Sequence, residues 1–247
     1  MLANRPSVLC TVATLLSLVV LVRAAGLSGS DSLWKDKPYQ QWTDEDISRL
    51  FTDSPWAHAL SIERTWVPWV NKELPEGPIH GGRGLPGSME QSSDQARGAQ
   101  ARFYVLWMSS LVMRKALARR AVLHYGKNEA EENEKLTQQP EEYFVVVQGT
   151  DMTPFHDKNE EYYRANVFLQ TRIGRQKISP SHVSYVMSPD GKSVYAAKFL
   201  FPKKTPAGEP VIAASEKSVQ FICGFEGSPL RADFDLQKMV GEKEPDL

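Results

Sequence analysis

The chain has 247 residues, of which 41% are hydrophobic and 24% are charged, and its formal net charge is −1. A globular chain of this size can bury a core that needs neither disulfides nor metals. The near-neutral charge argues against a nucleic-acid-binding protein, because such proteins take much of their affinity from a net basic surface.

Residues 1–24 have the pattern of a secretory signal peptide. Arg5 gives a positive start, residues 8–22 are an apolar run, and the small residue Ala24 ends the segment. The run is shorter than the roughly 20 residues of a bilayer-spanning helix. We therefore expect cleavage and a secreted or periplasmic protein without a stable membrane span. An uncleaved membrane anchor is the alternative.

Cleavage would remove Cys10 and leave Cys223, so the mature fold would not depend on an intramolecular disulfide. Cys10 lies within the apolar run, and its surroundings do not fit a lipid-anchor site. Two of the 29 basic residues, Arg5 and Arg23, lie in the signal segment, so the remaining chain carries 27 basic and 30 acidic residues.

The first elements of the mature chain are a flexible segment and a short helix. Residues 25–36 are mostly small and polar and predict flexibility. Residues 43–51 predict a helix, because Ile47, Leu50 and Phe51 recur at helical spacing. The first four residues of this stretch, TDED, fit a capping box.

A strand and a long insertion follow this helix. Residues 60–67 predict the strand, because Leu60, Ile62 and Trp66 share a period of two. Residues 71–100 are rich in Gly, Pro, Ser and Gln and poor in apolar residues, which predicts a flexible insertion.

The middle of the chain begins with a buried strand, FYVLWM, at residues 103–108. Ser109 or Ser110 can cap a following helix that continues to His124, and Gly126 can close it. One arc of this helix is apolar and is formed by Leu111, Met113, Leu117, Ala118 and Ala121.

Two further elements are expected before the last quarter. Residues 127–142 are charged and predict a linker, and the continuous apolar run at residues 143–149 predicts a buried strand. Asp157 with Glu160 can cap a helix that ends at Ile173, before a glycine.

The last quarter predicts β-structure. Residues 182–187 and 193–201 flank a Pro-Asp-Gly turn, and residues 219–225 and 232–236 alternate apolar and polar side chains. The order of elements predicts an α+β fold with a mixed or mostly antiparallel sheet and helices on one face. We expect residues 37–247 to form a single domain.

Familiar catalytic and metal-binding motifs are missing from the sequence. The five histidines have no ligand-like spacing, and the Gly-Lys-Ser at residues 191–193 lacks the first glycine of a phosphate loop. Cys223 falls on the apolar side of an alternating strand, which favours a buried structural thiol. The acidic residues within 44–53 do not match a calcium loop and are better explained as helix caps. No catalytic residue, metal site or cofactor is predicted.

Two sequence features are candidates for binding. Tryptophans gather near the start of the mature chain, where they could form a face for sugars or peptides or could pack in the core. Arg114 falls within the apolar arc of the helix after Ser110, so its guanidinium must extend to solvent, pair with a carboxylate or backbone carbonyls, or bind an anion. The candidate tryptophans are Trp42, Trp56, Trp66 and Trp69.

Three segments resemble a group of uncharacterised bacterial exported proteins. They are QWTDEDISRLFTDSPWA (41–57), FYVLWMSSLVMRKALAR (103–119) and ADFDLQKMV (232–240). The first is also distantly similar to the GWxTD motif. That motif is not intact, because Gln41 replaces the glycine and no residue separates Trp42 from Thr43. The resemblance implies export and a single domain, and it implies no activity, substrate or catalytic residue.

We therefore expect an exported, non-catalytic domain that binds a protein partner or a ligand at the bacterial cell envelope. One alternative is a secreted hydrolase whose site is assembled from distant residues. Its candidates are Asp151, His156 and His182 near strand and helix ends, with Arg114 as an anion clamp. The other alternative is a structural or assembly protein of the envelope.

Overall fold

The computed structural model describes residues 33–66, 100–225, 229–241 and 245–247. The predicted signal peptide, Trp69 and residues 71–99 of the predicted insertion lie outside these described residues. The end of the predicted flexible segment is a short helix, α1 (Leu33–Asp36), in which Trp34 is buried.

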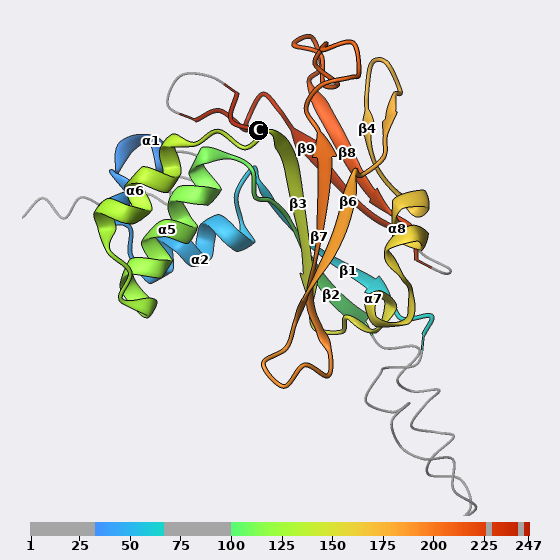
Figure 1. The fold of residues 1–247 in the computed structure, drawn as a ribbon, viewed down its shortest axis with the longest axis horizontal. Helices are drawn as coiled ribbons and strands as arrows, with labels where there is room; N and C mark the ends of the chain where they lie inside the picture. Colours follow the sequence, from blue (N-terminus) through green and yellow to red (C-terminus); the bar gives the residue numbers. More distant parts are fainter. Residues whose placement is uncertain (1–32, 67–99, 226–228, 242–244) are drawn as a thin grey trace, which may run out of the picture.

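The strands form two sheets in which every neighbouring pair is antiparallel (Figure 1). Sheet A has the order β1-β2-β3-β7-β6, and sheet B has the order β5-β4-β8-β9. With the helices, these sheets confirm the predicted α+β class. The strands of sheet A are β1 (Ala57–Glu63), β2 (Gln100–Trp107), β3 (Glu142–Gly149), β6 (His182–Met187) and β7 (Val194–Pro202). Those of sheet B are β4 (Val167–Thr171), β5 (Lys177–Ile178), β8 (Ser218–Cys223) and β9 (Leu230–Asp235).

The two sheets share one aromatic core. The ring of Phe221 on β8 lies 5.6 Å from that of Phe199 and 6.4 Å from that of Phe201, both on β7. At the other end of the core, Trp107 on β2 meets Phe234 on β9 with 5.1 Å between ring centroids. Sequence analysis predicted one sheet, and the second sheet is the main departure from that prediction.

The second sheet exists because residues 167–171 form a strand, whereas the sequence predicted the end of a helix. The helix is shorter: α7 (Thr153–Asp157) and α8 (Glu160–Asn166) replace it, and the Asn159 side chain caps α8 by accepting the Tyr162 N–H. The sequence VFLQT then buries alternate side chains and pairs with β8. Alternation with a β-branched start favours a strand over a helix.

Residues 127–142 also differ from the prediction of a linker. They contain a helix, α6 (Glu129–Thr137), whose N-cap Asn128 accepts the backbone N–H of Ala130 at 2.8 Å. Three glutamates in its first turn favour this helix electrostatically, because the helix N-terminus carries a partial positive charge.

The predicted starts of two helices are confirmed. In α2 (Asp44–Thr52), Thr43 and Asp46 form the capping box. In α5 (Leu111–Tyr125), Ser110 accepts the Met113 N–H and Gly126 closes the helix in the left-handed conformation, at φ +60°. The predicted strand at residues 143–149 is β3, and the predicted hairpin of residues 182–201 is β6–β7.

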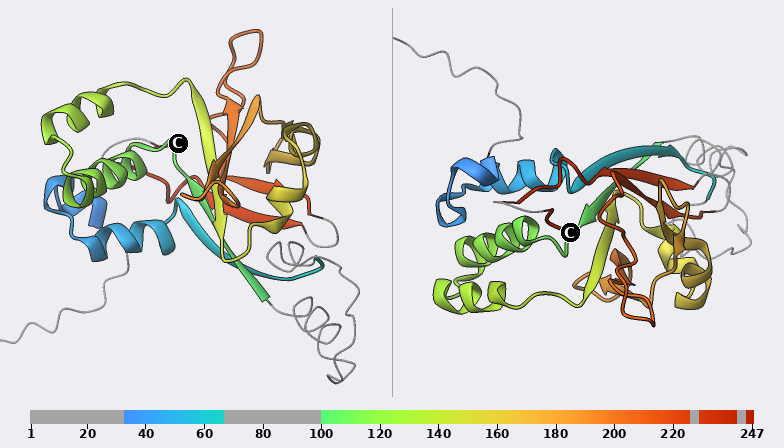
Figure 2. Two further views of the ribbon diagram at one scale, coloured as in Figure 1. Left: turned by 60° about the horizontal axis from the view of Figure 1, so that its bottom comes forward. Right: turned by 90° about the horizontal axis from the view of Figure 1, so that it is seen from above.

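The helices do not lie on one face. Figures 1 and 2 show α1, α2, α5 and α6 together on one side of the sheets, whereas α7 and α8 lie on the opposite side. Within the first group, α5 packs mainly on α6, α2 and the 3-10 helix η2 (Tyr39–Gln41), and α2 contacts β1 and β2. Among the described residues, no helix packs on the outer face of sheet A beyond β2, the face that is turned away from sheet B.

Candidate functional site

The tryptophans Trp42 and Trp56 are buried, so neither presents a ring face to solvent. The Trp42 indole N–H donates to the Lys37 carbonyl at 2.9 Å. The Trp56 indole N–H donates to the Asp246 carbonyl at 2.7 Å, and its ring meets Trp34 with 4.8 Å between centroids. These contacts correspond to the alternative in which the rings pack in the core.

Trp66 is half-buried and takes part in a buried polar cluster. Its indole N–H donates to Asp151 Oδ2 at 3.0 Å, and the guanidinium of Arg64 lies 2.9 Å from the same oxygen. Asp151 Oδ1 accepts the Thr153 N–H at 3.1 Å. The Asp151 carboxylate, which follows β3, is thus occupied by structural partners. Two of these partners, Arg64 and Trp66, lie just after the end of β1.

Arg114 caps a neighbouring helix. Its guanidinium donates to the Gln138 carbonyl at 2.7 Å and to the Leu136 carbonyl at 3.4 Å, at the C-terminal end of α6. Burial lowers the pKa of Arg114, and the charge of Asp246 opposes that shift. Backbone carbonyls are one of the partners that the sequence predicted for Arg114. Because the guanidinium donates to these carbonyls, the geometry does not support a role as an anion clamp.

The hydrolase candidates are not brought together. His156 contacts the Lys192 carbonyl at 3.1 Å, at the turn that follows β6, and His182 contacts Glu160 Oε1 at 2.7 Å, where β6 begins. The two histidines are therefore separated by the length of β6, roughly 16 Å at about 3.3 Å per residue. General acid–base catalysis needs its groups within hydrogen-bond reach of a common target.

The remaining candidate groups for catalysis or metal binding have structural roles or no suitable geometry among the described residues. The Cys223 thiol lies in the core, and burial raises its pKa, so it is not an activated nucleophile. Among the described residues, no group of three or more His, Cys, Asp and Glu side chains is arranged to hold a metal ion. The acidic residues at the start of α2 serve as its cap, as Thr43 and Asp46 show.

His58 predicts a pH dependence of stability. Its Nε2 is buried with no hydrogen-bond partner among the described residues, its ring meets Phe234 at 4.7 Å, and burial lowers its pKa against the opposing charge of Asp233. The unfolded chain protonates near the ordinary value of 6.5. The unfolded state therefore binds more protons below that pH, and the free energy of unfolding should fall as pH drops below about 6.5.

Urea unfolding at pH 7.5 and 5.5 checks this expectation. The variant His58→Phe should show a smaller loss of stability between the two pH values than the unmodified chain, since the other titrating groups are common to both. Equal losses in the two proteins would show that His58 does not titrate below its ordinary pKa.

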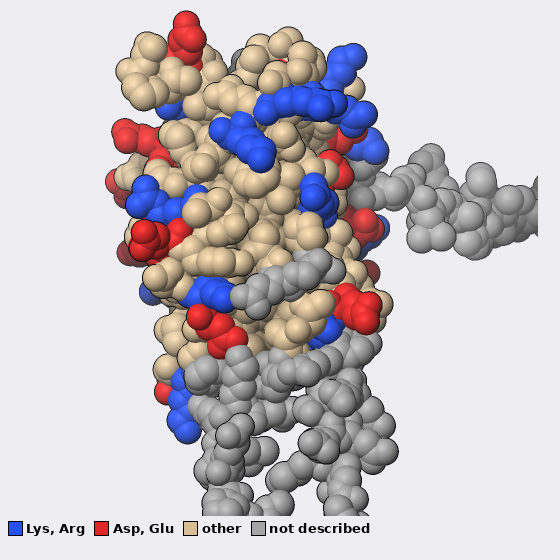
Figure 3. All heavy atoms as spheres, turned by 90° about the vertical axis from the view of Figure 1, so that its right-hand side faces the viewer, with Lys and Arg blue, Asp and Glu red and all other residues tan. Residues whose placement is uncertain are grey.

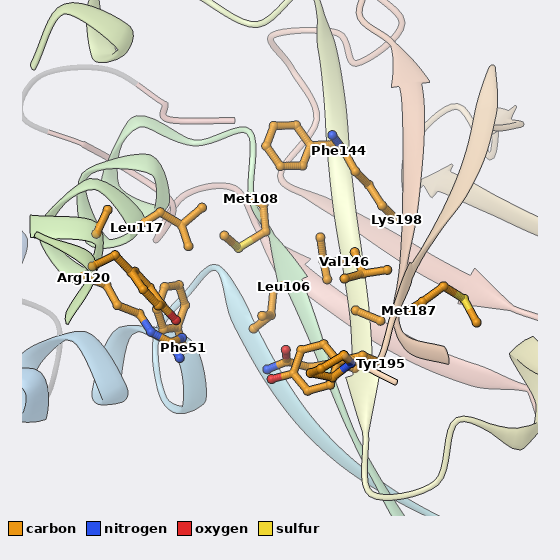
Figure 4. A pocket seen from close by; sticks show the side chains of 16 residues that line it. Phe51, Leu106, Met108, Leu117, Arg120, Phe144, Val146, Met187, Tyr195 and Lys198 are labelled. Atoms are coloured by element: carbon orange, nitrogen blue, oxygen red, sulfur yellow. The ribbon is translucent and has the colours of Figure 1, made fainter. Parts of the chain in front are cut away.

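A groove of about 660 Å³ lies between α5 and the outer face of sheet A (Figure 4). Its floor is formed by the cross-strand neighbours Leu106 and Val146, and Lys198, which pairs with Val146 from the next strand, begins the wall opposite α5. Side chains paired across antiparallel strands point to the same face. Met108 and Phe144 extend this floor.

Opposite walls of the groove carry exposed apolar side chains. Leu117 and Tyr125 come from α5, whereas Val186, Met187 and Tyr195 come from the edge strand β6 and from β7. Among the described residues, seven large hydrophobic side chains are exposed, and these five line the groove. Exposed apolar side chains scattered singly are ordinary, but a gathered set marks a binding surface.

Sequence reasoning missed this groove. Leu117 was expected in the apolar arc that packs in the core, and it is instead 42% exposed. The groove takes residues from α2, α5, β2, β3, β6 and β7, so no short stretch contains its pattern. The available signal was the hydrophobic outer residues of β3, Phe144 and Val146, which alternate with equally hydrophobic inner residues.

The face of the molecule that carries β4 and α8 shows no comparable feature. Among the residues coloured in Figure 3, acidic and basic side chains both occur across this face, with basic ones more frequent near its upper end. The described residues of this face therefore do not form the continuous basic surface that nucleic-acid binding uses.

Comparisons with models of protein families, with curated proteins and with solved structures gave no match. Within the described part of the chain, no helix combines the length and the apolar character that crossing a membrane requires.

Proposed function

We propose that this chain is an exported, non-catalytic binding domain of the bacterial cell envelope, and that it holds a small ligand with an apolar chain in the groove between α5 and sheet A. Export is supported by the signal-peptide pattern of residues 1–24, and the bacterial envelope by the resemblance of the three sequence segments. The binding role is supported by the site geometry.

One observation carries the binding role. Five of the seven exposed large apolar side chains of the described residues gather in one concave site, although they come from distant parts of the sequence. Leaving apolar side chains in water gives up about 1.5–3 kcal/mol for each large one that could be fully buried. A ligand that covers them would recover part of this free energy.

The size of the groove favours a small molecule. Its volume of about 660 Å³ falls within the range of roughly 300–1,000 Å³ that is typical of small-molecule sites. Figure 4 shows the side chains of Leu117, Met108 and Val146 around one common space. A second copy of the chain would need an extended complementary surface, and its presence would show in the oligomeric state.

The variant Leu117→Ser should weaken binding of a neutral, environment-sensitive dye such as Nile red about tenfold, which corresponds to about 1.4 kcal/mol. The control is Leu123→Ser: Leu123 lies on the same helix and is 40% exposed, close to the 42% of Leu117, but it does not line the groove. Fluorescence titration of the two variants and the unmodified chain gives the dissociation constants.

A second matched pair tests the opposite wall. Tyr195 (59% exposed) lines the groove, whereas Ile173 (64% exposed) lies beside β4 in sheet B. Tyr195→Ser should lower dye affinity and Ile173→Ser should not. The proposed function would be contradicted if each groove variant lowered dye affinity no more than its control does. It would also be contradicted if the unmodified chain bound no dye at all. A dimer whose dissociation exposes the dye site would contradict it as well.

A further inference from the structure

The charged side chains that line the groove are all positive. Arg120 on α5 and Lys198 on β7 are its only charged lining residues, and no carboxylate lines it among the described residues. The chain as a whole has slightly more acidic than basic residues. The described lining of the groove is therefore more positively charged than the chain as a whole.

Arg120 has no compensating anion within the described residues. It is exposed, and neither a hydrogen bond nor an ion pair joins it to another described side chain. The other arginines of α5 differ: Arg114 donates to carbonyls of α6, and Arg119 donates to the Trp42 carbonyl at 3.0 Å. Arg120 is thus the arginine of this helix that remains available to a ligand.

Lys198 has a weaker partner. Its ammonium lies 4.6 Å from the centre of the Phe144 ring, a cation–π contact that leaves its N–H donors unfilled by any carboxylate of the described residues. Figure 4 shows Arg120 beside Phe51 on the helical wall and Lys198 beside Phe144 on the opposite wall. The apolar floor lies between these two cations, so both raise the electrostatic potential of the groove.

We propose that the ligand is a single-chain anionic amphiphile of the fatty-acid type, with its chain on the floor formed by Leu106, Met108 and Val146 and its carboxylate at Arg120. This proposal rests on the proposed function and specifies its ligand. A guanidinium can bind a carboxylate through two parallel hydrogen bonds, which a lysine cannot do. Lys198 contributes charge from the opposite wall.

The concave shape favours a monomeric amphiphile over a membrane surface. Figure 4 shows Leu117 on the helical side of the groove and Met108 and Val146 on the sheet side, with a space between them where a single chain can enter. A flat bilayer surface cannot reach inner walls of this kind, because membrane-binding elements present their apolar side chains outward.

The test compares three ligands with fourteen carbons in the main chain, each added to the full-length protein at pH 8 below its micelle concentration or, for the alcohol, below its solubility limit. They are myristate, myristyl alcohol and tetradecyltrimethylammonium, and each is measured by displacement of the neutral dye. Myristate should bind at least about fivefold tighter than the alcohol, a preference expected for a partly exposed ion pair with hydrogen bonds. The cation should bind more weakly than the alcohol.

Charge-removing variants then locate the head group. Arg120→Gln should remove most of the preference for myristate over the alcohol, and Lys198→Gln should remove less. The matched controls are Arg172→Gln, directly after β4, and Lys177→Gln on β5, where the Lys177 ammonium lies 4.4 Å from the Phe168 ring in a contact like that of Lys198. The controls should leave the preference unchanged and should bind the alcohol as the unmodified chain does.

The outcomes separate this inference from the proposed function. Equal binding of all three amphiphiles, or a preference that survives Arg120→Gln, would overturn the anionic ligand while leaving an apolar site. Failure of the dye and of every amphiphile would overturn both proposals. Binding to anionic vesicles without binding of monomeric myristate would also overturn the inference, because it would assign the groove to a membrane surface.

Discussion

Replacing Phe221 by alanine is expected to lower the free energy of unfolding by about 3–5 kcal/mol. Phe221 is fully buried on β8, and its ring reaches Phe199 and Phe201 of sheet A. Its loss would open a cavity between the two sheets, where neighbours from both layers are held by their own strand pairing and can relax only in part. Urea or guanidinium unfolding followed by circular dichroism measures the change.

Phe168→Ala provides the control for this prediction. Phe168 lies on β4 in the same sheet, but it is only partly buried, and the ammonium of Lys177 covers its ring. Its removal should cost about 1 kcal/mol, because it opens no cavity between the sheets. Similar losses for the two variants would show that the aromatic core between the sheets is not the main source of stability.

The sequence was sufficient where local chemistry decides the structure. Thr43 and Asp46 fix the start of α2 by side-chain hydrogen bonds within four residues. Ser110 and Gly126 likewise bound α5, one by accepting a backbone N–H and the other by adopting a positive φ that costs glycine little. The continuous apolar run of β3 is also a signal that needs no distant residue.

The sequence was insufficient where distant pairing decides. Residues 167–171 follow directly after α8, and a short apolar run in that position is compatible with either a longer helix or a strand. Pairing of Val167 with Cys223 and of Thr171 with Val219 resolves this choice, and those partners lie about fifty residues away. Because β4 was not predicted, the predicted strands within residues 218–235 were assigned to the same sheet as the others.

The site shows the same limit. The sequence predicted binding residues at Trp42, Trp56 and Arg114, because clustered tryptophans and an arginine in an apolar arc are unusual. Each of these side chains instead packs in the core or caps a helix. Arg120 and Lys198 are ordinary residues in sequence. They gain significance only because the fold places them around one apolar floor with no carboxylate among its described lining residues.

The variant Trp56→Ala should lower the free energy of unfolding by about 3–5 kcal/mol, and Trp56→Phe by about 1–2 kcal/mol. Alanine removes the whole buried ring system, whereas phenylalanine keeps one six-membered ring and removes the rest of the indole together with the N–H that donates to the Asp246 carbonyl. That hydrogen bond matters because Asp246 also receives the Leu111 and Val112 N–H groups at the start of α5.

Under conditions where both Trp56 variants remain folded, their affinity for the neutral dye should stay within about twofold of that of the unmodified chain, a change of no more than about 0.4 kcal/mol. The reason is geometric: Trp56 is buried against Trp34 and the C-terminal residues, and it does not line the groove. A stable Trp56→Phe protein with lost dye binding would place the indole in a binding site. Loss of stability with unchanged dye binding would establish Trp56 as the residue that holds the C-terminal segment against α5.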